Sequence, residues 1–298
     1  LLTRTRGVDT IVAVFPPSLF MLLFPLMVPS RVKVVGIVHD LQGVYAAKKS
    51  GLVGRLLQGA IAFVERRAFL ACDQLIFLSE AMRSQTIAAY GLNKASTSVQ
   101  YPFVTLPDQG VALRKRLESK FKGGQKTIVY SGALGEKQAP EKLIRLLKHI
   151  VERDVNWRAQ IYSEGPIFRR LKEEVIHPSI SFHDLVPVED LPELLARSDI
   201  QIVPQEVGSS GGSLPSKLPN IVAANTKLLC ITDPGSELQE LVQAYSRGVV
   251  CTSWNIEECM KAFCELADLE AVDNAKDKIM LSKFTLEGLT QCLIQREA

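Results

Sequence analysis

The sequence lacks several features that would assign its chemistry at once. Its six cysteines are spread thinly, with no C-x-x-C pair and no Cys/His cluster at zinc-ligand spacing. It has neither a D-x-D motif, which could hold a metal between phosphates, nor a Walker A motif. We therefore expect no metal site, and we expect most cysteines to be small core residues in a reducing compartment, the cytoplasm.

Long hydrophobic runs are also missing. No stretch reaches the about 18–20 unbroken apolar residues of a membrane-spanning helix. The nearest, residues 18–28, is short and contains Pro25. Two interpretations stay open: a buried helix after a buried strand, or a surface that dips into a membrane. The chain begins at Leu1 rather than Met, so we expect the native product to be longer at its N-terminus.

Charge is small overall but uneven. Residues 1–103 carry 11 Lys/Arg and 5 Asp/Glu, a net +6, whereas residues 104–298 carry 24 and 27, a net −3. A basic first part could meet anionic lipid at the inner face of a membrane or a polyanionic acceptor, although ordinary surface charge explains it as well. Nucleic acid is not expected, because no recognised motif and no aromatic-basic interleaving are present.

Short apolar runs alternate with amphipathic stretches along the chain. This pattern predicts parallel sheets covered on both faces, with ligands bound beyond the carboxyl ends of the strands. The predicted strands are 11–14, 33–38, 74–78, 126–130, 158–162, 180–182, 200–203, 228–231 and 248–251, and the predicted helices are 52–71, 140–153, 167–175, 189–197, 217–224 and 236–244.

The helix predicted over 52–71 has an amphipathic pattern. Its expected buried face includes Leu56 and Phe63, and its expected exposed face includes Glu65, Arg66 and Arg67. Residues 105–125 contain Pro107, Gly110, Gly123 and Gly124 and no apolar run, which predicts a linker between two domains or a short polar helix within it.

One glycine-rich loop, from Gln205 to Lys217, follows a strand and opens a helix near Pro215. Glycines let the backbone approach a ligand, and Pro215 suits the first helical turn, whose amides favour an anion. Ser216 adds a hydroxyl donor and Lys217 a mobile positive charge, which suits a diphosphate. A flexible surface loop before an ordinary helix explains the pattern equally well.

Two further loops also join the end of a predicted strand to the start of a predicted helix. Gly132 and Gly135 permit a tight turn in which Lys137 can reach a phosphate, and Gly165 lies in the third loop. Each is also typical of a plain turn. Earlier in the chain, His39 and Asp40 end a strand, where they could position a nucleophile or a substrate hydroxyl, or form a satisfied polar pair.

Together these loops resemble, in order, the family 4 glycosyltransferases of the GT-B fold, and within them the colanic-acid or exopolysaccharide branch. The segments that carry the resemblance are 130–138, 214–218 and 234–238, supported by 77–82 and 190–199. The resemblance implies an α/β protein of two Rossmann-like parallel-sheet domains, the N-terminal one incomplete. The implied parts are 1–104 (acceptor side), 105–125 (linker), 126–275 (sugar-nucleotide side) and 276–298 (a helix returning to the first domain).

The same resemblance implies a retaining, metal-independent hexosyltransferase that needs no cofactor and whose partners are a sugar nucleotide and a saccharide or lipid-linked acceptor. Residues 184–187 would hold the base, and His39 or Asp40 would face the reacting sugar. The implied donor-binding residues are Gly132, Gly135, Lys137, Gln138, Gly165, Ser213, Ser216, Lys217, Asn220 and Glu237.

Departures from the family pattern keep a second interpretation open. A glutamate that in many relatives hydrogen-bonds the ribose is replaced by Asn220, and Tyr101–Phe103 replaces a usual Pro-Asn. About 70–90 residues of the first domain, judged from usual domain size, would precede Leu1. The chain could thus be a catalytically silent nucleotide-binding or assembly subunit. A sugar-nucleotide epimerase is a weaker alternative, since paired carboxylates and histidines for acid-base work are not found.

Overall fold

The computed structural model describes residues 7–23, 28–42, 52–107, 116–121, 124–270 and 275–294. These form two compact units. The first comprises Leu1–Pro102, Gly211–Leu214 and Lys283–Ala298, and the second comprises Phe103–Ser210 and Pro215–Ser282.

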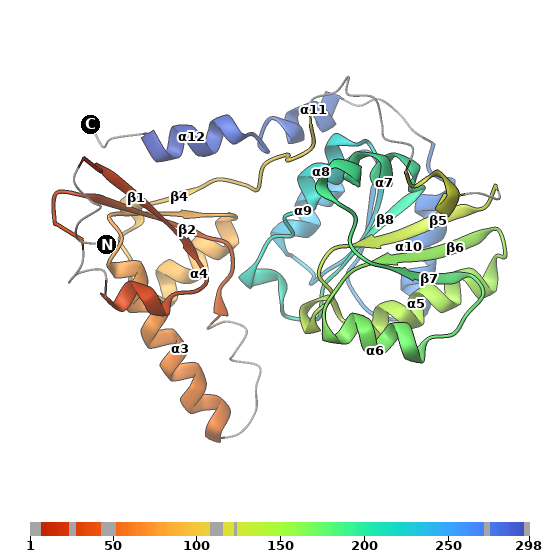
Figure 1. The fold of residues 1–298 in the computed structure, drawn as a ribbon, viewed down its shortest axis with the longest axis horizontal. Helices are drawn as coiled ribbons and strands as arrows, with labels where there is room; N and C mark the ends of the chain where they lie inside the picture. The colour runs from red at the N-terminus through yellow and green to blue at the C-terminus, as the bar shows by residue number, and fades with distance from the viewer. Residues whose placement is uncertain are drawn as a thin grey trace. The chain divides into compact units, whose positions relative to one another are not determined.

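The first unit contains a parallel sheet of four strands, in the order β1-β2-β3-β4 (Figure 1). Helices α3 and α4 supply the apolar core on one face, and α12 covers β2 and β3 on the other, where Leu289 and Leu293 pack on Val35 and Ile76. The elements are β1 (Thr10–Phe15), η1 (Leu19–Leu23), β2 (Lys33–Val38), α3 (Leu52–Leu70), β3 (Gln74–Phe77), α4 (Glu80–Tyr90), η2 (Lys94–Ser96), β4 (Thr97–Val99) and α12 (Leu286–Ile294).

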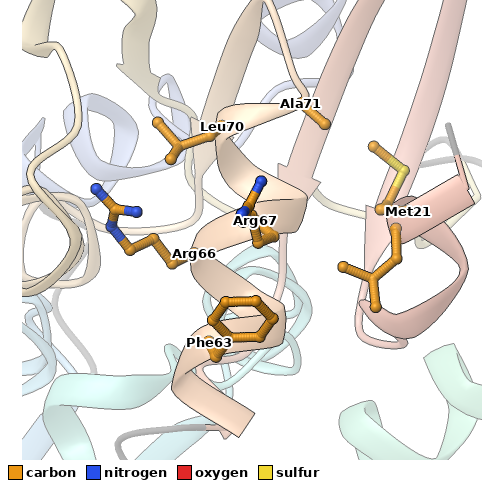
Figure 2. A pocket seen from close by; sticks show the side chains of 7 residues that line it. Met21, Phe63, Arg66, Arg67, Leu70 and Ala71 are labelled. Atoms are coloured by element: carbon orange, nitrogen blue, oxygen red, sulfur yellow. The ribbon is translucent and has the colours of Figure 1, made fainter. Parts of the chain in front are cut away.

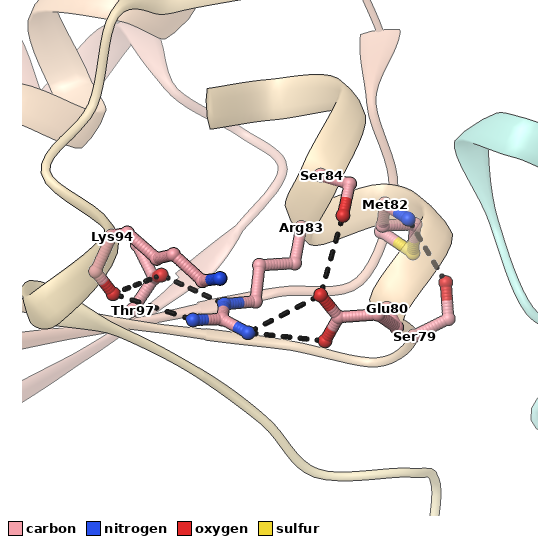
Figure 3. A network of polar contacts seen from close by, with 7 residues as sticks. All are labelled: Ser79, Glu80, Met82, Arg83, Ser84, Lys94 and Thr97. Atoms are coloured by element: carbon pink, nitrogen blue, oxygen red, sulfur yellow. Dashed lines mark hydrogen bonds and ion pairs between the residues drawn. The ribbon is translucent and has the colours of Figure 1, made fainter. Parts of the chain in front are cut away.

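Two elements of this unit, α4 and β4, were not predicted from the sequence. Ser79 caps α4 by accepting a hydrogen bond from Met82 N at 3.1 Å. Arg83 then pairs with Glu80 at 3.1 Å and donates to Thr97 Oγ1 at 2.8 Å, which ties the helix to the edge strand (Figure 3). These polar contacts position β4. A search of the sequence for alternating apolar residues does not detect such contacts.

Helix α3 has the predicted extent but turns a different face to the core. Leu56 and Phe63, predicted buried, are exposed, whereas Glu65, predicted exposed, is only 1% exposed. Glu65 accepts hydrogen bonds from Gln42 N and from the Tyr90 hydroxyl, both at 2.7 Å. These bonds offset the cost of burying a carboxylate. The predicted orientation of the helix is therefore wrong at these three residues.

One interpretation of the apolar run 18–28 was a buried helix. That interpretation is wrong for the part of the run that the structure describes. Leu19–Leu23 forms the single turn η1, in which Met21 is buried while Leu19, Phe20 and Leu22 are exposed. Met21 faces α3 across a cavity (Figure 2). Residues 24–27 lie outside the described residues. Among the residues that are described, no helix is long and apolar enough to cross a membrane.

The second unit is built on a six-stranded parallel sheet in the order β10-β9-β8-β5-β6-β7, which confirms the predicted parallel architecture. Every predicted strand is present within a residue or two; α10 was not predicted. The elements are η3 (Glu118–Phe121), β5 (Lys126–Ser131), η4 (Glu136–Gln138), α5 (Pro140–Arg153), β6 (Trp157–Tyr162), α6 (Pro166–Glu174), β7 (Ile180–His183), η5 (Val188–Asp190), α7 (Leu191–Arg197), β8 (Ile200–Pro204), α8 (Leu218–Ala223), β9 (Lys227–Ile231), α9 (Glu237–Ala244), β10 (Gly248–Cys251), α10 (Ile256–Asp268) and α11 (Ala275–Leu281). The turn η6 (Ser210–Gly212) begins in this unit, and its last two residues are assigned to the first.

Helices cover both faces of this sheet, with α5 and α6 on one side and α7 and α8 on the other (Figure 1). Alternate residues of β5 serve the two faces: Ile128 and Tyr130 join the larger core, and Val129 packs with Leu117 and Leu194. Chain order reverses at β5, which lies between β6 and β8. Such a reversal brings the loops after two central strands together at one sheet edge, where open α/β sheets bind ligands.

The interval 105–125, predicted as a linker or a short polar helix, is described only in part, because residues 108–115 and 122–123 lie outside the described residues. Where it is described, Leu117 is buried and Glu118–Phe121 forms a single 3₁₀ turn. The buried Glu193 accepts hydrogen bonds from the backbone amides of Arg116 and Leu117 at 2.9 and 3.2 Å. This part of the interval is therefore held against the second sheet.

Candidate functional site

The loops after β5 and β8 lie against each other at the reversal of strand order. Glu206 N donates to Lys137 O at 2.8 Å, which joins the two loops through their backbones. The Lys142 ammonium, from the first turn of α5, pairs with the Glu206 carboxylate at 2.6 Å. The two loops, predicted from the sequence to share one polyanionic ligand, therefore form one surface.

Lys217 reaches the end of β5 from the glycine-rich loop. Its ammonium donates to Ser131 O at 2.7 Å and lies 4.0 Å from the centroid of the Tyr130 ring. Gly132 follows with φ of +129°, and a Cβ there would lie 3.2 Å from Lys217 Nζ. A side chain at position 132 would be strained by its backbone and would crowd the ammonium, so glycine suits this close approach. The structure thus brings Gly132 and Lys217 together.

The environment of this ammonium makes it a ready partner for an anion. Burial lowers the pKa of Lys217 from 10.5 to about 7, because protein atoms replace the water that would solvate the charge. Its present partners, a carbonyl oxygen and an aromatic face, carry no full negative charge. A phosphate oxygen placed here would supply that charge and favour the protonated lysine.

Gly135 and Gln138 form a closed turn after β5. Gly135 N donates to Gln138 Oε1 at 2.9 Å, and Gln138 N donates back to Gly135 O at 3.0 Å. Gln138 therefore shapes the loop with its side-chain oxygen. Lys137, the residue before it, is half-buried on the same turn, two residues beyond Gly135.

Asp233, two residues after β9, holds the glycine-rich loop and was missed as a site residue. Its carboxylate accepts hydrogen bonds from Gly208 N at 2.6 Å, Ser210 N at 3.2 Å and the Ser210 hydroxyl at 2.6 Å. Charge-assisted bonds to backbone amides are among the stronger ones in proteins. A signal was available, because Asp233 immediately precedes the 234–238 segment and follows a predicted strand.

Two details around α8 differ from expectation. The helix begins at Leu218, so the prediction that Pro215 occupies its first turn is wrong; Pro215 O instead accepts from Leu218 N at 3.1 Å in a preceding turn. Asn220 is buried, and both ends of its amide contact Thr105: Oδ1 accepts from Thr105 N and Nδ2 donates to Thr105 Oγ1, each at 2.8 Å. A ribose contact by Asn220 would require it to leave Thr105.

The remaining predicted residues have these positions. In the second unit, Gly165 precedes α6 with φ of +100°, Ser216 is exposed beside Lys217, and Glu237 is the half-buried first residue of α9. Ser213 belongs to Gly211–Leu214, which groups with the first unit.

In the first unit, His39 and Asp40 follow β2. The backbone N of His39 donates to Phe15 O at 2.9 Å. Partial burial lowers the pKa of the His39 imidazole, and the neighbouring Asp40 carboxylate opposes that effect. In the described part of the chain, no group of three or more His, Cys, Asp or Glu side chains could hold a metal ion.

Comparison with known proteins identifies the kind of protein to which this architecture belongs. A family profile described as "Glycosyl transferases group 1" matches residues 113–279. The colanic acid biosynthesis glycosyl transferase WcaI of Escherichia coli K12 is 29% identical over 223 residues, which are 71% of this chain and 53% of WcaI. The chain thus spans about half the length of that relative.

Two other proteins extend the comparison to nearly the whole chain. The glycosyltransferase WbjE of Pseudomonas aeruginosa is 20% identical over 98% of this chain and 76% of its own length. The crystal structure of WaaG, described as a glycosyltransferase of lipopolysaccharide biosynthesis, superposes with a TM-score of 0.68 at 14% identity, over 93% of this chain and 81% of WaaG. The last likeness shows a GT-B-like fold with two parallel sheets.

Proposed function

We propose that this chain, which belongs to the glycosyl transferases group 1 family, transfers a hexosyl group from a nucleoside-diphosphate sugar to a saccharide or lipid-linked acceptor. The proposal places the reaction in synthesis of an exopolysaccharide or another cell-surface glycan, as the name of the relative WcaI suggests. It includes retention of configuration, as in family 4, and a cytoplasmic location. The sugar nucleotide is a substrate, and the proposal requires neither a cofactor nor a metal.

The observation that supports this proposal best is the convergence of Lys217 on the loop after β5. In the proposed complex, the diphosphate lies against Gly132, Gly135 and Lys137 from one loop and against Ser216 and Lys217 from the other. As the glycosidic bond breaks, negative charge grows on the diphosphate. A preorganised ammonium and loop amides stabilise that charge, which is commonly the largest single contribution to such catalysis.

The other candidate residues of the two units also have proposed roles. Gln138 and Gly165 shape the loops beside the diphosphate, Glu237 meets the sugar or a phosphate, and His39 or Asp40 faces the reacting sugar on the acceptor side. Ser213 is proposed as a further donor contact.

A nucleotide-release assay tests this function. We expect release of nucleoside diphosphate from one of a panel of UDP-, GDP- and ADP-sugars, with or without a lipid-linked saccharide. Lys217→Ala should lower turnover by about 100-fold, the effect typical of losing one stabilising donor. Lys261→Ala removes an exposed lysine from α10 and should leave turnover unchanged. Equal turnover in the Lys217→Ala variant and the wild type would show that the assignment is wrong.

The second candidate function is a nucleotide-binding subunit without turnover. The observation that supports it is the position of Asn220. Both the oxygen and the nitrogen of its side-chain amide already bond to Thr105, whereas the family resemblance leads us to expect a ribose contact from this residue. Calorimetry separates the two candidates, because a silent subunit binds a nucleoside diphosphate but releases none from any sugar nucleotide.

A further inference from the structure

Two cysteine side chains lie against each other in the second unit. Cys251 is the last residue of β10, and Cys259 is the fourth residue of α10. Both thiols are free, and their sulfur atoms are 3.6 Å apart. The sulfurs of a disulfide bond are about 2.05 Å apart, so a movement of roughly 1.5 Å brings this pair to bonding distance.

The two thiols differ in exposure and in acidity. Cys251 is 4% exposed, whereas Cys259 is 0% exposed. A hydrogen bond from the Cys259 S–H lowers the pKa of the Cys251 thiol from its ordinary 9.0 to about 6, although burial opposes the shift. The same bond raises the pKa of Cys259. Cys251 is therefore the sulfur that a small oxidant meets as a thiolate, with the Cys259 thiol next to it.

The turn after β10 connects this pair to the candidate site. Ser253 O accepts hydrogen bonds from both thiols, at 3.1 Å from Cys251 Sγ and 3.2 Å from Cys259 Sγ. The next residue, Trp254, donates its indole N–H to Gln205 O at 2.9 Å. Gln205 is the first residue of the glycine-rich loop that ends at Lys217. The two thiols thus help to hold the turn that anchors the start of that loop.

A second connection between the pair and the loop runs through the residue after β9. Cys251 O accepts a hydrogen bond from Thr232 N at 3.1 Å, and the Thr232 hydroxyl donates to Gln205 Oε1 at 2.6 Å. Residues bonded to Cys251 or to its turn therefore hold both the backbone and the side chain of Gln205. A displacement of Cys251 acts on the loop by both connections.

We propose that Cys251 and Cys259 form a redox-sensitive modification site, which hydrogen peroxide converts to a disulfide, and that the disulfide weakens donor binding by loosening the start of the glycine-rich loop. The effect on donor binding rests on the proposed function. Disulfide formation removes both S–H groups, so Ser253 O loses two donors while the end of β10 is drawn toward α10. Disulfides that form in a reducing compartment are commonly transient and redox-sensing.

The oxidation proceeds in two balanced steps. The Cys251 thiolate attacks one oxygen of hydrogen peroxide, the O–O bond breaks, and Cys251 becomes a sulfenic acid while the released hydroxide takes up a proton to form water. The Cys259 sulfur then attacks Cys251 Sγ, the S–O bond breaks, and the hydroxyl group leaves with the Cys259 proton as a second water. Two thiols are oxidised and one peroxide is reduced. Hydrogen peroxide is close to water in size, which suits the small exposure of Cys251.

Peptide mapping by mass spectrometry tests the modification without any nucleotide. After treatment of the native chain with micromolar hydrogen peroxide, we expect the peptides of Cys251 and Cys259 to be linked and to have lost two hydrogen atoms. Dithiothreitol should reverse the change. Cys72 should remain a thiol, because burial raises its pKa to about 12. The proposal is overturned if Cys251 and Cys259 stay unlinked in the native chain under an exposure that oxidises them in urea.

Single variants assign the two roles. Cys259→Ser should accumulate a sulfenic acid at Cys251 that dimedone traps, since no thiol remains beside it. Cys251→Ser should leave Cys259 reduced. Cys264→Ser, a half-buried cysteine of the same helix, is the matched control and should form the disulfide as the wild type does. Trapping of Cys259 rather than Cys251 would reverse the assigned order and contradict the role given to Cys251.

Calorimetry with UDP, GDP and ADP then measures the effect on donor binding. The oxidised wild type and the oxidised Cys264→Ser variant should bind the preferred nucleotide about tenfold more weakly than the reduced proteins, the effect of losing about one net hydrogen bond. Cys251→Ser should bind equally well with and without peroxide. Unchanged affinity after disulfide formation would show that the link to the loop is wrong. A reduced protein that binds none of the three nucleotides would instead contradict the proposed function, while the disulfide detected by mass would stand.

Discussion

The low pKa of Lys217 predicts that nucleotide binding takes up a proton from solution. Burial lowers that pKa to about 7, so in the free protein the side chain is mostly a neutral amine above this pH. A bound diphosphate favours the charged form and raises the pKa. The proton needed to charge the lysine must then come from the buffer.

The size of the effect follows from the two pKa values. At pH 8.5, a lysine with a pKa of about 7 is about 3% protonated, whereas one restored to its ordinary 10.5 is about 99% protonated. On binding, Lys217 should therefore take up nearly one proton at pH 8.5 and almost none at pH 5.5. The sign is fixed by linkage: because the complex holds more protons than the free protein, Kd should rise about tenfold per pH unit above 7.

Isothermal titration in two buffers of different ionisation enthalpy measures this uptake directly. The terminal phosphate, with a pKa of about 6, is already ionised at pH 8.5, so the ligand contributes little. Lys217→Met should abolish the buffer dependence, and Lys261→Met should retain it. Identical heats in both buffers for the wild type would refute the reasoning, since the lysine would then not change its charge on binding.

Three further variants probe the architecture of the site. Gly132→Ala should weaken nucleotide binding at least tenfold in calorimetry, because the φ of +129° is strained for alanine and the added methyl group would displace the nearby ammonium, whereas Gly91→Ala, also at positive φ, should not. Asp233→Asn should raise the nucleotide Kd with little change in Tm, since it loosens the glycine-rich loop. Asn220→Ala should lower the free energy of unfolding by roughly 1–3 kcal/mol in a denaturant titration, because Thr105 loses both partners; an unchanged midpoint would contradict this role.

The sequence was sufficient for the strands other than β4 and for the strand-to-helix loops proposed to bind the donor. The runs 34–38 and 228–231 contain no polar residues and so show no alternation, which is the pattern of strands buried on both faces. Parallel strands place the loops that follow them at one edge, so Gly132 and Lys217 were identifiable as candidates before any coordinates. These properties are local, and residue type and spacing carry them.

The orientation of α3 could not be obtained in the same way. A helical pattern identifies an apolar face but assumes that charged residues avoid the core. Glu65 violates that assumption, because its partners, Gln42 and Tyr90, are 23 and 25 residues away in the chain. The exposed Phe63 is the consequence, and it became visible only once those distant partners were placed.

By itself, then, the sequence determined the parallel α/β architecture and the loops able to approach an anion. Only the tertiary structure decided that β5 lies beside β8, which brings the Lys217 ammonium to Ser131 O across 86 residues of chain. The physical reason is that secondary structure follows the periodicity of neighbouring residues. Which loops meet depends instead on strand order and on hydrogen bonds between residues distant in the chain.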